Sequence, residues 1–285
     1  MPALGVGTNR WSADASDLAS LQETLAAAVD TGTGFFDTAE IYSHGRSEIA
    51  LGQAARKDGR PVLIASKFAP YAHRVTTKQF ASALDRTLER LERDSIDLYY
   101  LHFPSMRGVG TWMRAMANAV RAGKIRAVGI SNCDATQMQR AVRVLARRGI
   151  PLAANQVHYS LLHRQPEVDG VLDACRQMDV ALVAYRPIGR GAISAGSAPA
   201  SATASATAPG QSGLDDVLRD VAAARGATAA QVALAWLLKR DDHVIPIAGT
   251  TKPEHVRENA GALSLELSDE EFTAIDRASA PVPVT

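Results

Sequence analysis

Short apolar segments alternate with longer amphipathic segments along almost the whole chain. The apolar segments are four to seven residues long, which is typical of buried strands and too short for helices. The strands that this pattern predicts cover residues 4–7, 34–38, 62–66, 96–102, 125–131, 152–156, 180–185 and 243–249.

The longer segments have the apolar spacing of helices. Phe80, Leu84, Leu88 and Leu91 recur at three- and four-residue intervals, which places them on one helical face. Thr76 or Thr77 can cap one helix and Asp134 another. The predicted helices cover residues 17–31, 46–58, 77–93, 110–122, 134–148, 166–178, 213–240 (as two helices) and 253–260.

Eight strand–helix units without a break in composition predict a closed (β/α)₈ barrel, or TIM barrel, as one domain over residues 1–285. A doubly wound sheet remains open, because it also alternates strands and helices. The glycine-rich turns GVGTNR (5–10) and GRGAIS (189–194) both lack the third glycine of the dinucleotide fingerprint GxGxxG. A nucleotide site would therefore be built in another way.

Residues 195–212 differ from the rest, because they are almost entirely Ala, Ser, Thr, Pro and Gly. Such a composition buries too little apolar area to fix a conformation, so a mobile low-complexity loop is expected. Because the loop follows the seventh predicted strand, it would lie above the carboxyl end of the barrel. A tolerated insertion and a cofactor lid both remain open.

Composition excludes several classes of protein. The 31 basic and 30 acidic residues leave a net charge of +1, which provides no electrostatic basis for binding nucleic acid or a membrane surface. Cys133 and Cys175 form no CxxC motif, which favours a reducing compartment. The first residues lack a signal-peptide pattern, and no apolar run reaches membrane-spanning length. We expect a soluble cytoplasmic protein, monomeric or weakly associating.

Polar side chains follow neighbouring predicted strands at the barrel end where active sites form. The segment FFDTAEIYSHGRSE (35–48) ends the second strand with Asp37 and then presents Tyr42 in a loop. Lys67 follows the third strand and His102 ends the fourth. Each residue alone is more often a surface or core group, but their occurrence on neighbouring strands indicates one catalytic site.

This set of side chains suits proton transfer to a reduced carbonyl group. A tyrosine phenol ordinarily has a pKa of about 10, so a lysine cation beside it is needed to favour proton exchange near neutrality. An aspartate can hold the lysine, and a histidine can orient the carbonyl oxygen or relay a proton. No cluster has metal-ligand spacing, and no GxSxG motif of a serine hydrolase occurs.

Later strands end in amide and hydroxyl groups. Ser131 and Asn132 follow the fifth strand, and Asn155 and Gln156 end the sixth. Such groups can pair with loop backbone, but together they also supply the donors and acceptors that a nicotinamide carboxamide requires. Tyr185, at the end of the seventh strand, can stack on a nicotinamide ring or merely cap the core.

The segment AGTTKPEHVREN (248–259) combines a glycine turn, hydroxyl groups and a lysine with the start of a helix at Pro253. A helix N-terminus carries free backbone N–H groups and a partial positive charge. Together with Lys252 it predicts an anion-binding site.

Seven motifs together carry a resemblance that covers nearly the whole chain. They are FDTAEIYSHGRSE, the lysine of IASKF, the histidine of YLHFP, GKIRAVGISN, NQVHYS, AYRPIGRG and AGTTKPEHVREN. In order and spacing the chain resembles an aldo-keto reductase. The resemblance implies an NADPH-dependent carbonyl reductase on a (β/α)₈ barrel.

The resemblance also implies roles for individual residues. Tyr42 would be the acid, assisted by Lys67, Asp37 and His102. The carboxamide would be held by Ser131, Asn132 and Gln156, and Tyr185 would stack on the nicotinamide. Gly249, Thr250 and Lys252 would lie near the adenosine phosphate, and Glu258 and Asn259 near adenine. The further cofactor contacts expected are Gly7, Thr8, Arg186, Arg190 and His255.

One position departs from the family pattern. His255 stands where many members carry an arginine against the 2′-phosphate, so NADH is an open alternative to NADPH. Arg186, Arg190 or Lys252 could replace that cation.

The expected substrate is a small aldehyde or ketone, bound between the cofactor and loops above the barrel. Loop position makes five residues candidates for the pocket wall, although any of them can instead pack in the core: Trp11, His44, Tyr71, Phe103 and Trp112. Two other classes remain open: a cofactor-binding regulatory subunit with little turnover, and a barrel isomerase or lyase that uses no nicotinamide.

Overall fold

The computed structural model describes residues 1–14, 17–189, 193 and 211–280. Eight parallel strands form a closed barrel in sequence order, and β1 pairs with both β2 and β8. The barrel predicted from the sequence is confirmed, and the doubly wound alternative is excluded. The strands are β1 (Gly5–Gly7), β2 (Phe35–Asp37), β3 (Leu63–Phe68), β4 (Ile96–Leu101), β5 (Ile125–Ser131), β6 (Leu152–His158), β7 (Ala181–Tyr185) and β8 (Val244–Gly249).

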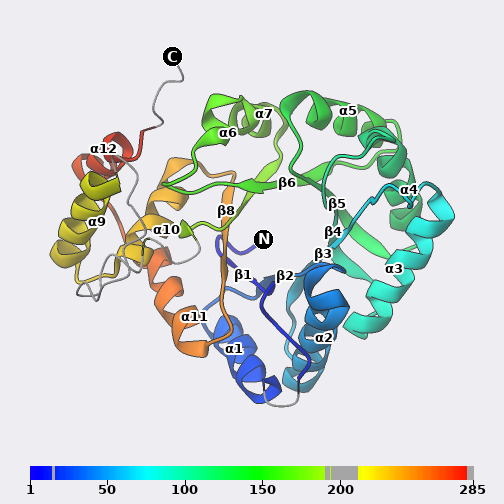
Figure 1. Cartoon of the computed structure of the whole chain (residues 1–285), viewed down its shortest axis with the longest axis horizontal. Helices are drawn as coiled ribbons and strands as arrows, with labels where there is room; N and C mark the ends of the chain where they lie inside the picture. Colours follow the sequence, from blue (N-terminus) through cyan, green and yellow to red (C-terminus); the bar gives the residue numbers. More distant parts are fainter. Residues whose placement is uncertain (15–16, 190–192, 194–210, 281–285) are drawn as a thin grey trace.

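Helices surround the barrel on its outside (Figure 1). Four of them begin with a capping box, and three of these are formed by Thr76 with Gln79, Asp134 with Gln137, and Thr228 with Gln231. The helices are α1 (Leu18–Asp30), α2 (Arg46–Asp58), α3 (Thr77–Leu91), α4 (Val109–Arg121), α5 (Ala135–Ala146), α6 (Gln165–Val168), α7 (Val171–Met178), α9 (Gln211–Arg225), α10 (Ala229–Arg240), α11 (Pro253–Ala260) and α12 (Asp269–Ala278).

Two helical regions differ from the sequence prediction. The single helix expected over 166–178 is two helices, because Gly170 adopts a left-handed conformation with φ 78° between α6 and α7. Helix α12 was not predicted, although Ser268 and Glu271 form its capping box. Figure 1 shows α12 beside α9 at the edge of the molecule.

The segment 213–240 folds as two helices, as expected. Gly226, with φ 61°, follows α9, and the two helix axes are bent by 95°. Trp236 and Leu237 of α10 are fully buried against the barrel. Within the described residues no single helix is long and apolar enough to cross a membrane, and only this bent pair meets the length and composition criteria together.

The low-complexity segment lies almost entirely outside the described residues. Residues 194–210 are not described, and the last two residues of the expected loop, 211–212, belong to α9. Its role as an insertion or a lid stays a prediction.

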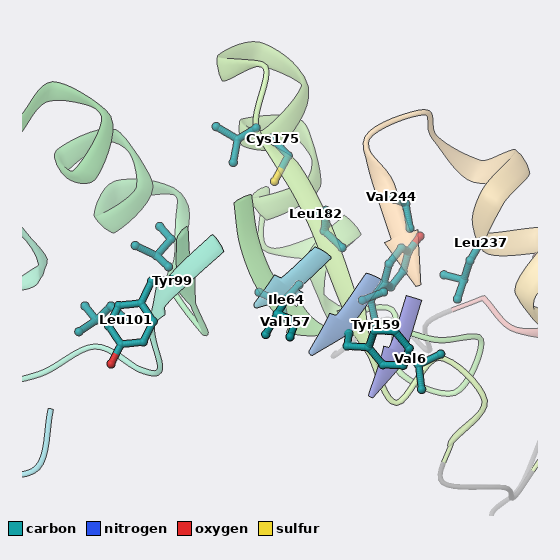
Figure 2. Packing of buried hydrophobic residues seen from close by; sticks show 14 of the residues in the cluster. Val6, Ile64, Tyr99, Leu101, Val157, Tyr159, Cys175, Leu182, Leu237 and Val244 are labelled. Atoms are coloured by element: carbon teal, nitrogen blue, oxygen red, sulfur yellow. The ribbon is translucent and has the colours of Figure 1, made fainter. Parts of the chain in front are cut away.

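Side chains of each strand alternate between the barrel interior and the helix layer. Phe35 and Tyr100 point inward, whereas their neighbours Phe36 and Tyr99 belong to the outer cluster. Figure 2 shows part of this outer cluster, including Leu237 of α10 and Val244 of β8. The interior is filled by side chains, so a ligand can enter only above it, at the carboxyl ends of the strands.

One glycine is required by this interior packing. A Cβ atom on Gly129 would lie 2.4 Å from Cδ1 of Tyr100, whose ring occupies the space beside β5. That distance is far below van der Waals contact, so any larger residue would displace the ring. Gly129 thus leaves room for Tyr100 in the layer below the site.

Candidate active site

A cavity of about 670 Å³ opens at the carboxyl ends of the strands. The position is the one that the barrel fold predicts for an active site. Most of the residues predicted from the sequence meet there. Those that line the cavity are Gly7, Thr8, Asp37, Tyr42, His102, Ser131, Asn132, Gln156, Tyr185, Arg186, Gly249, His255, Glu258 and Asn259.

A buried ion pair lies at the base of the cavity. Lys67 is fully buried, and its Nζ donates to Asp37 Oδ1, to the carbonyl oxygen of Thr38 at 2.8 Å and to the hydroxyl of Tyr42 at 3.3 Å. Burial would lower the pKa of the Lys67 ammonium, but Asp37 and Tyr42 outweigh burial and raise this pKa. Lys67 is therefore held as a cation that faces the phenol oxygen of Tyr42.

Asp37 is also held from the opposite side of the barrel. Strands β2 and β6 lie four strands apart in the eight-stranded ring, so their inward side chains face each other. Nε2 of Gln156 donates to Asp37 Oδ2 at 2.7 Å, and the hydroxyl of Thr8 donates to the Asp37 carbonyl oxygen at 3.0 Å. Both carboxylate oxygens thus have donors, which offset part of the loss of water around the charge, although burial still raises the pKa of Asp37 above its usual value.

Tyr42 begins an unusual turn, the short 3₁₀ element η1 (Tyr42–Gly45). Ser43, His44 and Gly45 all have positive φ, at 47°, 56° and 88°. Left-handed residues other than glycine cost on the order of 1–3 kcal/mol each and tend to occur at functional sites. The hydroxyl of Ser47 stabilises the next turn by donating to the Thr8 carbonyl oxygen at 2.7 Å.

His102 contributes a neutral imidazole. Burial, and secondarily the positive charge of Lys67, lower the pKa of His102 to about 3. Its Nδ1 is buried and has no hydrogen-bond partner among the described residues. The ring packs edge to face against Tyr42, with centroids 5.9 Å apart. A neutral imidazole beside the phenol can orient a carbonyl oxygen by a hydrogen bond, and it adds no second positive charge next to the Lys67 ammonium.

Asn132 connects the catalytic side chains to the other half of the cavity. Its backbone is left-handed, with φ 56°, which turns the side chain back over the end of β5. Nδ2 donates to the His102 carbonyl oxygen at 3.2 Å, and Oδ1 accepts a hydrogen bond from the Tyr185 hydroxyl at 3.0 Å. Ser131 donates to the carbonyl oxygen of Gln156 at 2.8 Å. One lone pair of Asn132 Oδ1 and the Oε1 of Gln156 remain to accept hydrogen bonds from a ligand.

The loop between β8 and α11 forms the far end of the cavity. Thr250 Oγ1 accepts from the backbone N–H of Lys252 at 3.0 Å and lies 3.4 Å from Nδ1 of His255. Gly249 pairs in register with Gly7, and both line the cavity without a side chain to fill it. A Cβ atom on Gly249 would lie 3.4 Å from the side chain of Asn9. The two glycines leave room for a ligand along this edge.

Comparison with known proteins agrees with this geometry. The sequence profile of the Aldo/keto reductase family matches residues 3–280. The chain belongs to the aldo/keto reductase family. It is 33% identical over 299 residues to aldo-keto reductase yakc (NADP(+)) of Schizosaccharomyces pombe, covering 94% of this chain and 86% of that protein. It is 32% identical to methylglyoxal reductase YeaE of Escherichia coli, covering 98% and 91%.

Solved structures of aldo-keto reductases have the same fold. The aldo-keto reductase from Klebsiella pneumoniae in complex with NADPH superposes with a TM-score of 0.83 at 33% identity, covering 100% of this chain and 93% of that one. The thermostable aldo-keto reductase Tm1743, in complex with the inhibitor epalrestat, gives a TM-score of 0.82 at 33% identity.

Two of the predicted wall residues do not reach the cavity of this aldo/keto reductase. Trp11 is fully buried, and its Nε1 donates to the Thr250 carbonyl oxygen at 2.7 Å. Trp112 is also fully buried and packs on Phe68, with ring centroids 4.9 Å apart. Trp112 Nε1 donates to Ser105 Oγ, in the loop after β4, at 2.8 Å. Both buried indoles thus bond loops instead of lining the pocket, and the prediction that they line it is corrected.

Two of the other predicted wall residues, Phe103 and Tyr71, extend outward from His102. The Phe103 ring lies 5.7 Å from His102, and the Tyr71 ring lies 6.0 Å from Phe103. Tyr71 and His44 are exposed. None of these three rings lines the cavity itself. They could contact a substrate only through a part of that substrate that extends out of the cavity.

Some predicted residues do not line the cavity, and other residues were missed. The catalytic candidate Lys67 lies against the hydroxyl of Tyr42 without lining the cavity itself. The predicted cofactor residues Thr250 and Lys252 do not line it either, and Arg190 lies outside the described residues. Asn9 and Arg10 line the cavity directly after Thr8, a position that the strand-end rule could have identified. Pro187 and Ile188 line the cavity after the end of β7 and fit the same rule, whereas the remaining lining residues, Ala230 on α10 and Ile247 within β8, carry no such signal.

Proposed function

We propose that the protein reduces a small aldehyde or ketone to the alcohol with NADPH. The observation that carries this proposal is the placement of a lysine cation, held by Asp37, against the hydroxyl of Tyr42 at the base of the cavity. A phenol beside a buried cation can donate its proton as an alkoxide develops.

The chain's own residues divide the chemistry in the following way. When bound, NADPH supplies the hydride that reaches the carbonyl carbon. Tyr42 donates the proton to the carbonyl oxygen, so that the oxygen becomes a hydroxyl group. Lys67 stabilises the phenolate left behind, and Asp37 keeps Lys67 in place. Neutral His102 orients the carbonyl oxygen toward Tyr42.

The described residues fit the cofactor chemically. Asn132 Oδ1 and Gln156 Oε1 retain acceptor capacity for the amide protons of a nicotinamide carboxamide. Arg10, Arg186 and His255 line the cavity and supply positive charge or hydrogen-bond donors for phosphate groups. Their number favours NADPH over NADH, since the 2′-phosphate adds negative charge.

The decisive experiment replaces Tyr42 with Phe. NADPH oxidation is followed with a panel of aldehydes and ketones that includes methylglyoxal, the substrate named for a bacterial relative. We expect Tyr42→Phe to lower kcat by about 10²–10⁴ through loss of the general acid. Affinity for NADPH, measured by tryptophan fluorescence, should stay nearly unchanged.

Two outcomes would contradict the proposal. Full activity in the Tyr42→Phe variant would show that another group donates the proton. NADPH binding by the wild type without turnover of any carbonyl would favour the regulatory alternative. The cytoplasmic location and the monomeric or weakly associating state stay predictions from the sequence.

A further inference from the structure

Three aromatic rings form a parallel column beside the cavity. The rings of Tyr185 and His158 are 5.3 Å apart between centroids, with an interplanar angle of 8°. The rings of His158 and His163 are 4.0 Å apart, with an angle of 9°. The column therefore runs from the cavity wall through two successive histidines.

Strand register places the first two rings against each other. His158 of β6 pairs with Tyr185 of β7, so their side chains emerge at the same height. Gln156, two residues before His158, points inward to Asp37, and Val183, two residues before Tyr185, lies in the interior cluster. Because side chains alternate along a strand, His158 and Tyr185 share that inward side, at the top of the barrel.

A closed turn delivers the third ring. Ser160 and His163 exchange two backbone hydrogen bonds, of 3.1 Å and 3.0 Å, directly after β6. Leu161, inside this turn, is buried and anchors it. This hydrogen-bonded turn places the His163 ring against the His158 ring.

The column lies behind Tyr185 with respect to the cavity. Tyr185 lines the cavity, whereas neither histidine does. The Tyr185 hydroxyl is held by Asn132, and the Arg186 guanidinium lies 5.7 Å from the ring centre. The single hydrogen bond to Asn132 still allows the Tyr185 ring to tilt about its hydroxyl end. The stacked ring of His158 opposes that tilt.

We propose that His158 and His163 are positioning residues that set the plane of Tyr185 and, through it, the plane of the bound nicotinamide. The inference rests on the proposed function, because it requires a nicotinamide stacked on Tyr185. Hydride transfer depends steeply on the distance and orientation of the reacting carbon atoms. When His158 holds the Tyr185 ring in place, the surface on which the nicotinamide stacks is fixed, and with it the orientation of the nicotinamide.

The test compares His158→Ala, His158→Phe and His163→Ala in the full-length protein. We expect His158→Ala to raise the Kd for NADPH by about threefold to tenfold, the value of one lost ring contact. It should also increase the primary deuterium isotope effect with 4-deuterated NADPH, because the hydride step becomes slower. His163→Ala should change both quantities in the same direction by a smaller factor. His158→Phe retains a stacking ring and should restore both to nearly wild-type values.

A matched control separates this role from general stability. His243 lies at the opposite end of the barrel, where it bonds Asp241. His243→Ala should leave the Kd and the isotope effect unchanged, and melting temperatures of all variants identify any that fail to fold. If His158→Ala is unstable, His163→Ala still provides the test, since its ring ends the column.

Two results would overturn the inference. One is a folded His158→Ala variant whose NADPH affinity and isotope effect equal those of the wild type. The other is a His158→Phe variant as impaired as His158→Ala, which would assign the effect to the polar nitrogen atoms instead of the ring. Failure of the proposed function would look different, because the wild type itself would then reduce no carbonyl compound, whether or not it bound NADPH.

Discussion

Two tyrosines line the same cavity, but different forces hold them. Tyr42 lies against the Lys67 ammonium, and its orientation depends on a buried ion pair. Tyr185 lies against His158, and its orientation depends on ring packing and one hydrogen bond to Asn132. The first arrangement suits a group that changes charge during the reaction, and the second suits a surface that has to remain flat.

The comparison teaches that the two halves of the site differ in their sensitivity to substitution. A buried charge that loses its partner is costly, because the remaining ion has no water around it. A ring that loses one stacked neighbour keeps its other contacts and loses far less. Asn132 touches both halves, through the His102 carbonyl oxygen and the Tyr185 hydroxyl.

The largest expected effect comes from Lys67→Met in the charged half. The substitution leaves Asp37 buried without its cation, which should lower the free energy of unfolding by about 3–5 kcal/mol. It also removes the cation beside Tyr42, so kcat should fall by about 10²–10⁴. Urea denaturation and NADPH oxidation measure the two effects separately.

The double variant Asp37→Asn, Lys67→Met provides the control. With no charge left in the pair, it should regain much of the stability lost in the single variant. Its activity should stay low, because Tyr42 still lacks the ammonium. Equal stability of the single and double variants would show that an unpaired carboxylate is not the source of the loss.

A smaller effect is expected from His102→Asn, and it depends on pH. The folded-state pKa of His102, about 3, lies below its usual value of 6.5, so the unfolded chain binds more protons between these values. The contribution of His102 to stability is therefore complete above pH 6.5 and is lost as the pH falls toward 3.

Between about pH 7 and pH 5 the wild type should lose about 2 kcal/mol more stability than His102→Asn. Thermal or urea unfolding at the two pH values measures this difference. Parallel losses in both proteins would mean that His102 is not held neutral in the folded state.

The strand ends made much of this site predictable from the sequence. Asp37, Lys67 and His102 each end a short apolar segment or follow it directly, and a parallel barrel gathers such positions at one end. Local signals also marked two helix starts, at Thr76 and Asp134. Helix α12 begins with the same local signal, Ser268 with Glu271, so its start is also encoded in the sequence.

The remainder depends on tertiary contacts that no local pattern encodes. Trp11 follows a strand end like the true cavity residues, but its indole turns down to the Thr250 carbonyl oxygen. The bond from Asn132 to His102 requires a left-handed backbone at residue 132. The stack of His158 on Tyr185 requires the register between β6 and β7.

The smallest expected effect sharpens the comparison within the aromatic half. Tyr185→Phe removes the hydrogen bond to Asn132 but keeps the ring that His158 backs. One neutral hydrogen bond contributes about 0.5–1.5 kcal/mol, so the Kd for NADPH should rise only about twofold to tenfold. The deuterium isotope effect should remain that of the wild type, because the ring plane is retained. A large increase in that isotope effect would show that the hydroxyl, and not the histidine column, sets the orientation of Tyr185.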